Sequence, residues 1–170
     1  MRRLPPLLAL VATLSVGAAA VASARSGSLS SELKEVRAAT ARFHSVDQAL
    51  AAGYFAASPC EESGAGAMGI HFINPALFGP GLDPLSPEVL LYAPRADGSL
   101  ELVGVEYFQV DADQDLATAA DRPSLFGRAF DGPMLGHNPQ MPIHYDLHVW
   151  VAEANPSGIF APWNPALNCP

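Results

Sequence analysis

Two histidines and one glutamate stand in segments whose other residues are mostly apolar and favour β-strands. Their positions are His71 in segment 68–73, Glu106 in segment 100–110 and His148 in segment 143–152. An unpaired carboxylate on an apolar strand face is costly to bury, so Glu106 requires a partner. Neutral imidazole nitrogens and carboxylate oxygens are the donors with which proteins hold zinc, copper or iron. The three residues are therefore predicted to form a transition-metal site.

The segment around His148 offers further polar side chains. Side chains alternate along a strand, so His144, Asp146 and His148 point to the same face. The Cα atoms of His144 and His148 would be roughly 13 Å apart. His148 is therefore the preferred ligand, and His144 becomes a fourth ligand only if the strand bends. Asp146 and Tyr107 are expected to support the ligands from behind, as carboxylates do at many metal sites.

Three aromatic residues near the C-terminus are candidates for an apolar pocket beside the histidines: Trp150, Phe160 and Trp163. Packing in the core is the alternative for all three. Glu106 has an alternative partner in Arg128, and His71 can be a core histidine that donates to a backbone carbonyl. The chain contains no H-E-x-x-H, H-x-H or G-x-S-x-G motif. A metal-free module for small ligands and a structural protein with a buried polar network therefore stay open beside the metal hypothesis.

The N-terminus is typical of a cleaved signal peptide. Arg2 and Arg3 are followed by an apolar run and then by Ala22-Ser23-Ala24, so cleavage is predicted after Ala24. Residues 25–30 are expected to be a flexible leader, and residues 31–170 a single domain. The protein is expected to be secreted or periplasmic, with no attachment to the membrane after cleavage. In such a compartment the only two cysteines, Cys60 and Cys169, most simply form a disulfide.

The composition narrows the range of partners. Nine basic and seventeen acidic residues are present, and Arg2 and Arg3 precede the cut, so the remaining chain carries a formal charge of −10. Such an acidic chain without a basic stripe is a poor ligand for nucleic acid or anionic lipid. A small molecule or a metal ion is the expected partner.

The pattern of apolar residues predicts an α+β fold. Residues 31–53 are expected to form two short helices or one kinked helix, with a capping box at Ser45 and Gln48 and a stop at Gly53. Strands are expected over 68–73, 88–92, 100–110 and 143–152, the second and third joined by a hairpin turn at Asp97-Gly98. Residues 111–122 read as a loop, and residues 123–142 as irregular structure. The predicted fold has N-terminal helices packed on an antiparallel sheet or a partly open β-barrel.

Several short motifs resemble those of a family of exported bacterial proteins whose activity is uncharacterised. They are ALAAGY at 49–54, MGIH at 68–71, VEY at 105–107, LHVW at 147–150, NPSGIF at 155–160 and WNP at 163–165, ahead of Cys169. The resemblance covers most of the chain after the predicted cut. It implies no activity, but it singles out His71, Glu106 and His148 as the positions to test first. His144 belongs to none of these motifs.

Overall fold

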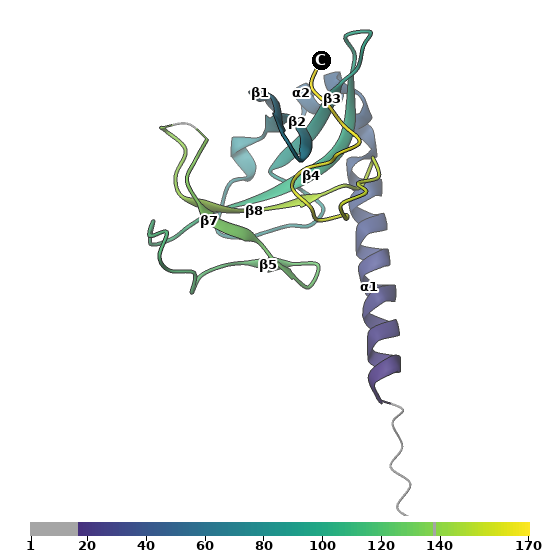
Figure 1. Ribbon diagram of the computed structural model, residues 1–170, viewed down its shortest axis with the longest axis vertical. Coiled ribbons are helices and arrows are strands. Elements are labelled where there is room, and N and C mark those ends of the chain that lie inside the picture. Colours follow the sequence, from purple (N-terminus) through teal and green to yellow (C-terminus); the bar gives the residue numbers. More distant parts are fainter. Residues whose placement is uncertain (1–16, 138) are drawn as a thin grey trace, which may run out of the picture.

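The computed structural model describes residues 17–137 and 139–170, and it places helices before an antiparallel sheet (Figure 1). The predicted α+β class is therefore confirmed. The helical elements are α1 (Gly17–Thr40), η1 (Ala41–His44), α2 (Val46–Ala51) and η2 (Pro75–Leu77). The strands are β1 (Phe55–Ser63), β2 (Gly66–Ile73), β3 (Val89–Pro94), β4 (Leu100–Val110), β5 (Ser124–Leu125), β6 (Arg128–Ala129), β7 (Asp131–Met134) and β8 (His144–Val149).

The helical region starts earlier than its apolar periodicity predicts. Residues 25–30, which were expected to be a flexible leader, belong to α1. Residues 1–16 of the predicted signal peptide lie outside the described residues, and cleavage after Ala24 stays a prediction. No helix in the described part of the chain is long and apolar enough to cross a membrane.

The end of α2 follows the predicted stop, whereas its start does not follow the predicted cap. Gly53 adopts a φ of 96° and donates to Leu50 O, while Tyr54 N–H donates to Ala49 O. These two bonds form a Schellman motif, which favours glycine at this position. Ser45 precedes the helix, but its side chain makes no capping hydrogen bond. The predicted capping box is therefore wrong, and the start of this short helix is held by its packing.

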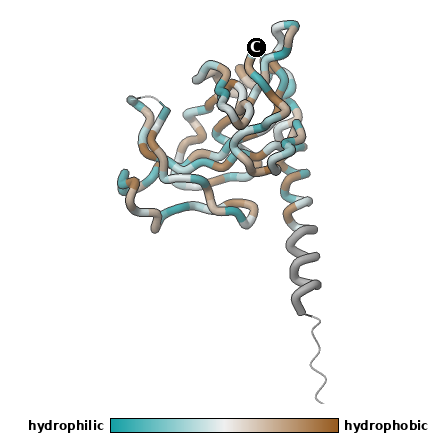
Figure 2. The backbone as a smooth tube through the Cα atoms, in the orientation of Figure 1, coloured by the Kyte–Doolittle hydropathy of each residue, from teal (hydrophilic) through white to brown (hydrophobic). Residues whose placement is uncertain are grey.

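Six strands form one antiparallel sheet in the order β1-β2-β3-β4-β8-β7, and the sheet is curled into half a barrel. The predicted hairpin joins β3 to β4, with Gly98 at a φ of 82° and Ser99 N–H donating to the Asp97 carboxylate. Figure 2 shows the tip of this hairpin as hydrophilic. Strands β1 and β7 were not predicted. Their residues are mostly small, polar or proline, so pairing with β2 and β8 determines their conformation.

The two faces of the sheet have different environments. One face carries the main core, in which Val36, Phe43 and Ala49 of the helical region pack against apolar side chains of the strands. Those strand residues include Phe72, Leu90, Tyr92, Val105, Tyr107, Leu147 and Val149. The opposite face carries a smaller cluster containing Val89, Leu91, Phe108 and Trp150, part of which is covered by Leu167 of the C-terminal tail. The histidines and Glu106 lie on this second face.

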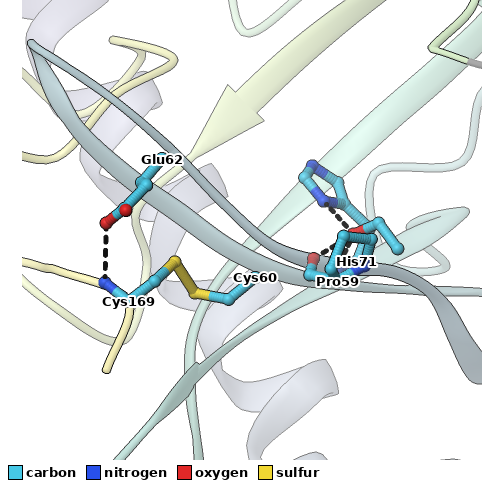
Figure 3. The surroundings of a disulfide bond; sticks show 6 residues. Pro59, Cys60, Glu62, His71 and Cys169 are labelled. Atoms are coloured by element: carbon cyan, nitrogen blue, oxygen red, sulfur yellow. Dashed lines mark hydrogen bonds between the residues drawn. A yellow bond between two sulfur atoms is a disulfide. The ribbon is translucent and has the colours of Figure 1, made fainter.

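The C-terminal tail is fastened to the edge of the sheet at two places. The predicted disulfide between Cys60 and Cys169 is confirmed, and Cys169 N–H also donates to the Glu62 carboxylate at 3.2 Å (Figure 3). Further along the tail, Asn164 and Ala67 exchange backbone hydrogen bonds of 3.0 and 3.1 Å. A Cβ atom on the nearby Gly66 would lie 2.2 Å from Asn164 O, so this close approach requires glycine.

The disulfide is expected to contribute strongly to stability, because it closes a loop across a sequence separation of 109 residues. Replacing both Cys60 and Cys169 with serine should lower the free energy of unfolding by about 5 kcal/mol, the scale for a loop of this length in the chain-entropy model. The measurement is urea unfolding of the variant and of oxidised wild type. Wild type treated with a thiol reductant should match the variant, and an unchanged midpoint in both would contradict the prediction.

Candidate metal centre

The curvature of the sheet brings together side chains from strands that are not neighbours. Glu106 on β4 lies directly opposite His148 on β8 in the strand register. His71 lies on β2, which is separated from β4 by the whole of β3. Strands two positions apart in a flat sheet are roughly 9.6 Å apart, too far for a short side chain to bridge. Curling of the sheet and the length of the imidazole and glutamate side chains close this gap above Val89.

The three side chains converge on one point. Glu106 Oε2 lies 3.2 Å from His71 Nε2 and 3.7 Å from His148 Nε2. One ligand atom from each residue falls within 4.8 Å of the other two, and the described residues contain no other such group of histidine, cysteine or carboxylate donors. The edge of a tetrahedron around zinc is about 3.3 Å for zinc-to-ligand bonds of the usual length. The three side chains could therefore hold a metal ion after small adjustments.

All three residues are removed from solvent. The exposed fractions are 9% for His71, 5% for Glu106 and 2% for His148. Burial of a carboxylate beside two imidazoles requires compensation by charge or by a bound cation. The two imidazole rings are nearly perpendicular, at 89°, with centroids 6.1 Å apart. Each ring directs a nitrogen toward the same carboxylate oxygen.

Ser58 on β1 fixes which nitrogen of His71 carries the proton. The Ser58 hydroxyl donates to Pro59 O at 2.7 Å, and its oxygen accepts from His71 N–H at 3.2 Å. His71 Nδ1 lies 3.1 Å from the same oxygen. A hydroxyl has one proton, so Nδ1 must be the donor in this contact. His71 Nε2 is therefore the nitrogen that carries the lone pair in the neutral ring, and it faces Glu106. Figure 3 shows His71 beside Pro59, next to the disulfide.

Asp146 stands behind His148 as the sequence predicts. Its Oδ1 lies 3.8 Å from His148 Nδ1, which is longer than a hydrogen bond. Asp146 is also paired in the register with Asp131 of β7, which brings a second carboxylate close. Asp146 therefore lies next to the His148 ring but makes no hydrogen bond to it.

The two buried carboxyl groups of the site, Glu106 and Asp146, differ in pKa. Burial works to raise the pKa of Glu106, but the neighbouring His148 and His71 outweigh it and the pKa is lowered. Burial, Glu106 and Asp131 together raise the pKa of Asp146 to about 8. Glu106 is thus ionised and Asp146 neutral near pH 7 in the metal-free protein. Two carboxyl groups with opposite protonation states in one site are a common feature of functional centres.

The pKa values of His71 and His148 are also shifted in opposite directions. Burial works to lower the pKa of His71, but the charge of Glu106 outweighs it and the pKa rises above 6.5. Burial lowers the pKa of His148, and Glu106 offsets this only in part. His71 therefore takes the proton that neutralises Glu106, and His148 keeps a neutral ring.

Several polar atoms of the site have no hydrogen-bond partner. They are Glu106 Oε2 and both ring nitrogens of His148. The remaining buried side-chain atoms of this kind in the described chain are His144 Nε2 and the two carboxylate oxygens of Asp111. Buried polar atoms without partners are rare in folded proteins and require a cause. A cation between the two Nε2 atoms and Glu106 Oε2 would provide a partner for His148 Nε2 and Glu106 Oε2, but not for His148 Nδ1.

A cavity of about 340 Å³ adjoins the three residues. His71 and Glu106 line it, whereas His148 is not among its lining residues. Its walls are mostly apolar side chains, including Ile73, Phe78, Val89, Phe108 and Val110. The group can therefore be reached from solvent on the side of His71 and Glu106.

Other residues predicted for the site lie elsewhere. His144 is fully buried, with Nδ1 donating to Pro142 O and its ring stacked on Phe108, so it lies outside the three-residue group. Two pleats of strand separate it from His148. The predicted role of Tyr107 is wrong, because Tyr107 points into the main core and its hydroxyl donates to Pro84 O.

The predicted aromatic pocket is also wrong. Trp150 is buried and its indole N–H donates to Ala161 O, and neither Phe160 nor Trp163 lines the cavity. The alternative partner of Glu106 is excluded as well: Arg128 lies exposed on β6, and the ion pairs of Glu106 are with the two histidines.

Sequence patterns missed Ser58 and Phe78. Ser58 lies on a strand whose residues have weak β propensity, and only its pairing with β2 brings it to His71. Phe78 follows the turn at Asn74-Pro75 and stacks on Phe108, with ring centroids 5.0 Å apart. Phe108 itself shares a strand face with Glu106 by simple alternation, and this signal was available in the sequence.

In the metal-free protein, the effect of Glu106→Gln on the free energy of unfolding should depend on pH. The raised pKa of His71 contributes stability that is complete below pH 6.5 and lost as the pH rises through the folded value. The lowered pKa of Glu106 contributes stability that is present above pH 4.5 and lost as the pH falls. Glu106→Gln should therefore cost roughly 3 kcal/mol at pH 6, the scale for breaking a buried ion pair, and much less at pH 9. Urea unfolding in the presence of a chelator measures the loss at both pH values.

Asp146→Asn is the matched control. The raised pKa of Asp146 obliges the folded protein to keep this carboxyl group neutral at a pH where the unfolded chain ionises it, so Asp146→Asn should stabilise the protein at pH 6 and stabilise it further at pH 9, opposite in sign to Glu106→Gln. An equal loss for Glu106→Gln at both pH values would show that the ion pair with His71 does not form.

No protein-family model, curated protein or solved structure matches this chain.

Proposed function

We propose that this protein binds one transition-metal ion through His71 Nε2, His148 Nε2 and a carboxylate oxygen of Glu106. The observation that carries the proposal is the convergence of three buried donor atoms, two of which have no hydrogen-bond partner. Two imidazoles and one carboxylate suit zinc, and they also suit non-haem iron and copper. Calcium and magnesium prefer oxygen donors, so they are poor candidates.

The number of protein ligands supports an accessible metal ion. Structural zinc sites are closed by four protein ligands, whereas catalytic sites have three and leave a position for water or substrate. Here two of the three donor residues line a cavity. A metal ion at this position supplies a Lewis acid and lowers the pKa of bound water toward neutrality. Ser58 then holds the ring of His71, and the apolar walls limit access of bulk water.

A purely structural network explains the site less well. Such a network saves free energy only when all its polar atoms are satisfied. Both nitrogens of His148 lack partners, and Glu106 Oε2 lies near His71 Nε2 without meeting hydrogen-bond geometry. A cation would account for His148 Nε2 and Glu106 Oε2, and a closed network does not.

The cavity supports a second candidate function, a metal-free site for a small ligand. Its volume lies at the small end of the range for ligand pockets, and its apolar walls with a few polar groups are typical of such sites. In this case the ligand would donate a hydrogen bond to Glu106 or accept a hydrogen bond from His71. The two candidates differ in whether ligand binding requires a metal ion.

We also infer that the protein acts outside the cytoplasm, after removal of its signal peptide. A disulfide that joins the tail to the sheet suits an oxidising compartment. The signal peptide itself is inferred from sequence alone.

The metal proposal predicts one equivalent of zinc, copper or iron in protein purified without a histidine tag. His148→Ala and Glu106→Gln should each reduce bound metal to less than about a tenth of an equivalent, because two donors rarely hold an ion against a chelator. The measurement is elemental analysis, followed by titration of chelator-treated protein with each ion.

Two substitutions serve as controls for this experiment. The exposed His44→Ala should keep the full equivalent, and so should His144→Ala, whose ring lies outside the three-residue group. Folded wild-type protein that binds none of the three ions would overturn the metal proposal and favour the metal-free site.

Ser58 is predicted to act on metal affinity through His71. Ser58→Ala removes the acceptor that fixes the ring and its tautomer, so zinc affinity should fall by about ten- to one hundredfold, the usual effect of losing such a partner. Calorimetric titration with zinc measures this fall. Ser124→Ala, at an exposed position on β5, should leave the affinity unchanged, and equal affinities in both variants would contradict the role of Ser58.

A further inference from the structure

The cavity beside the metal site has features that identify a class of ligand, and this inference rests on the proposed metal function. Its base is formed by His71 and Glu106, with Ser58 beside them. The deeply buried His148 does not line it. Any molecule that reaches the metal position from the cavity therefore arrives over His71 and Glu106, on the side where the three protein ligands leave a position free.

The walls provide a hydrophobic surface of defined shape. Phe78 and Phe108 stack with an interplanar angle of 29°, and the ring of His144 stacks on Phe108 at 24°. Aliphatic side chains of Ile73, Val89 and Val110 complete much of the wall. Phe78 is 37% exposed and Val110 is 40% exposed, so apolar surface at the cavity is left in contact with water. A ligand with an apolar body would cover this surface.

The charges around the cavity limit the polar part of the ligand. A divalent ion held by two neutral imidazoles and one carboxylate carries a formal charge of +1. Apart from Glu106, the described residues that line the cavity include no aspartate, glutamate, lysine or arginine. One anionic group on the ligand would therefore neutralise the metal. The polar residues Ser58, His137 and Gln140 also line the cavity, but none of them has a permanent positive charge to pair with a second anionic group.

The size of the cavity limits the apolar part. A volume of about 340 Å³ lies near the lower limit for small-molecule sites. It suits a body of about one substituted aromatic ring or a branched aliphatic chain of similar size, and it excludes large polycyclic molecules.

We infer that the cavity binds a small apolar monocarboxylate, with its carboxylate on the metal ion and its body against Phe78 and Phe108. The ligand is thus a monoanion with a single polar end. Dianions are excluded because their second charge would meet no lysine or arginine among the described lining residues.

The test uses zinc-loaded protein and phenylacetate as the probe, with binding measured by isothermal titration calorimetry. Acetate supplies the same carboxylate without the ring, and phthalate supplies a ring with two charges. Phenylacetate should bind at least tenfold more tightly than either. Its affinity should fall at least tenfold when zinc is removed with a chelator. Cobalt-substituted protein provides a second readout, because carboxylate coordination changes its visible absorption spectrum.

A variant of the wall separates the roles of the ring and the carboxylate. Phe78→Ala should weaken phenylacetate at least threefold while leaving zinc and acetate affinities unchanged. Leu85→Ala removes a similarly exposed apolar side chain outside the cavity lining and should change none of the three affinities.

The outcomes distinguish this inference from the function on which it rests. Protein that binds zinc but prefers acetate or phthalate to phenylacetate would overturn the ligand class and leave the metal site intact. Equal binding of phenylacetate with and without zinc would overturn the contact between carboxylate and metal. Failure of wild-type protein to bind any metal ion would overturn both proposals.

Discussion

The buried carboxylate of Glu106 is the constraint on which the functional face of this protein depends. It is ionised although only 5% of the residue is exposed, and the imidazoles that stabilise it come from strands on either side of it in the sheet. Its charge also acts on other groups. Together with burial, it contributes to the raised pKa of Asp146, about 8, and to that of Glu88, about 7. Burial and this ionised carboxylate together thus keep Asp146 mostly neutral near pH 7 and Glu88 about half neutral.

The edge of the sheet explains how His71 is held in position. Strand β1 has weak β propensity, yet it carries Ser58, which accepts two hydrogen bonds from His71. Two residues further along, Cys60 is joined to the C-terminal tail (Figure 3), and that tail also pairs with β2 at Ala67. The disulfide therefore holds an edge strand that would otherwise fray, and the same edge strand orients a residue of the site. Stability of the edge and geometry of the site are thereby linked.

Much of the fold and the centre of the site could be predicted from the sequence, because strong local signals carry them. Asp97-Gly98 marks the hairpin, Gly53 marks the helix end, and apolar runs mark strands β2, β3, β4 and β8. His71, Glu106 and His148 stood out as polar residues in such runs. The sequence could not predict which side chains contact one another across the strands. Ser58 and Phe78 reach the site only through tertiary pairing and packing, and the curl that brings β2 to β4 has no local signature.

The errors share a physical cause, which is that alternation along a strand assigns a face but not a neighbour. His144 is on the correct face of β8, yet two pleats of strand take its ring to Phe108 instead of Glu106. Trp150 also lies on this face and is covered by the tail, where its N–H bonds to Ala161 O. Tyr107 lies on the opposite face, in the main core. The tail therefore occupies one end of the second face and the cavity the other, with the three metal-binding candidates between them. The cavity on this face thus reaches the site over His71 and Glu106.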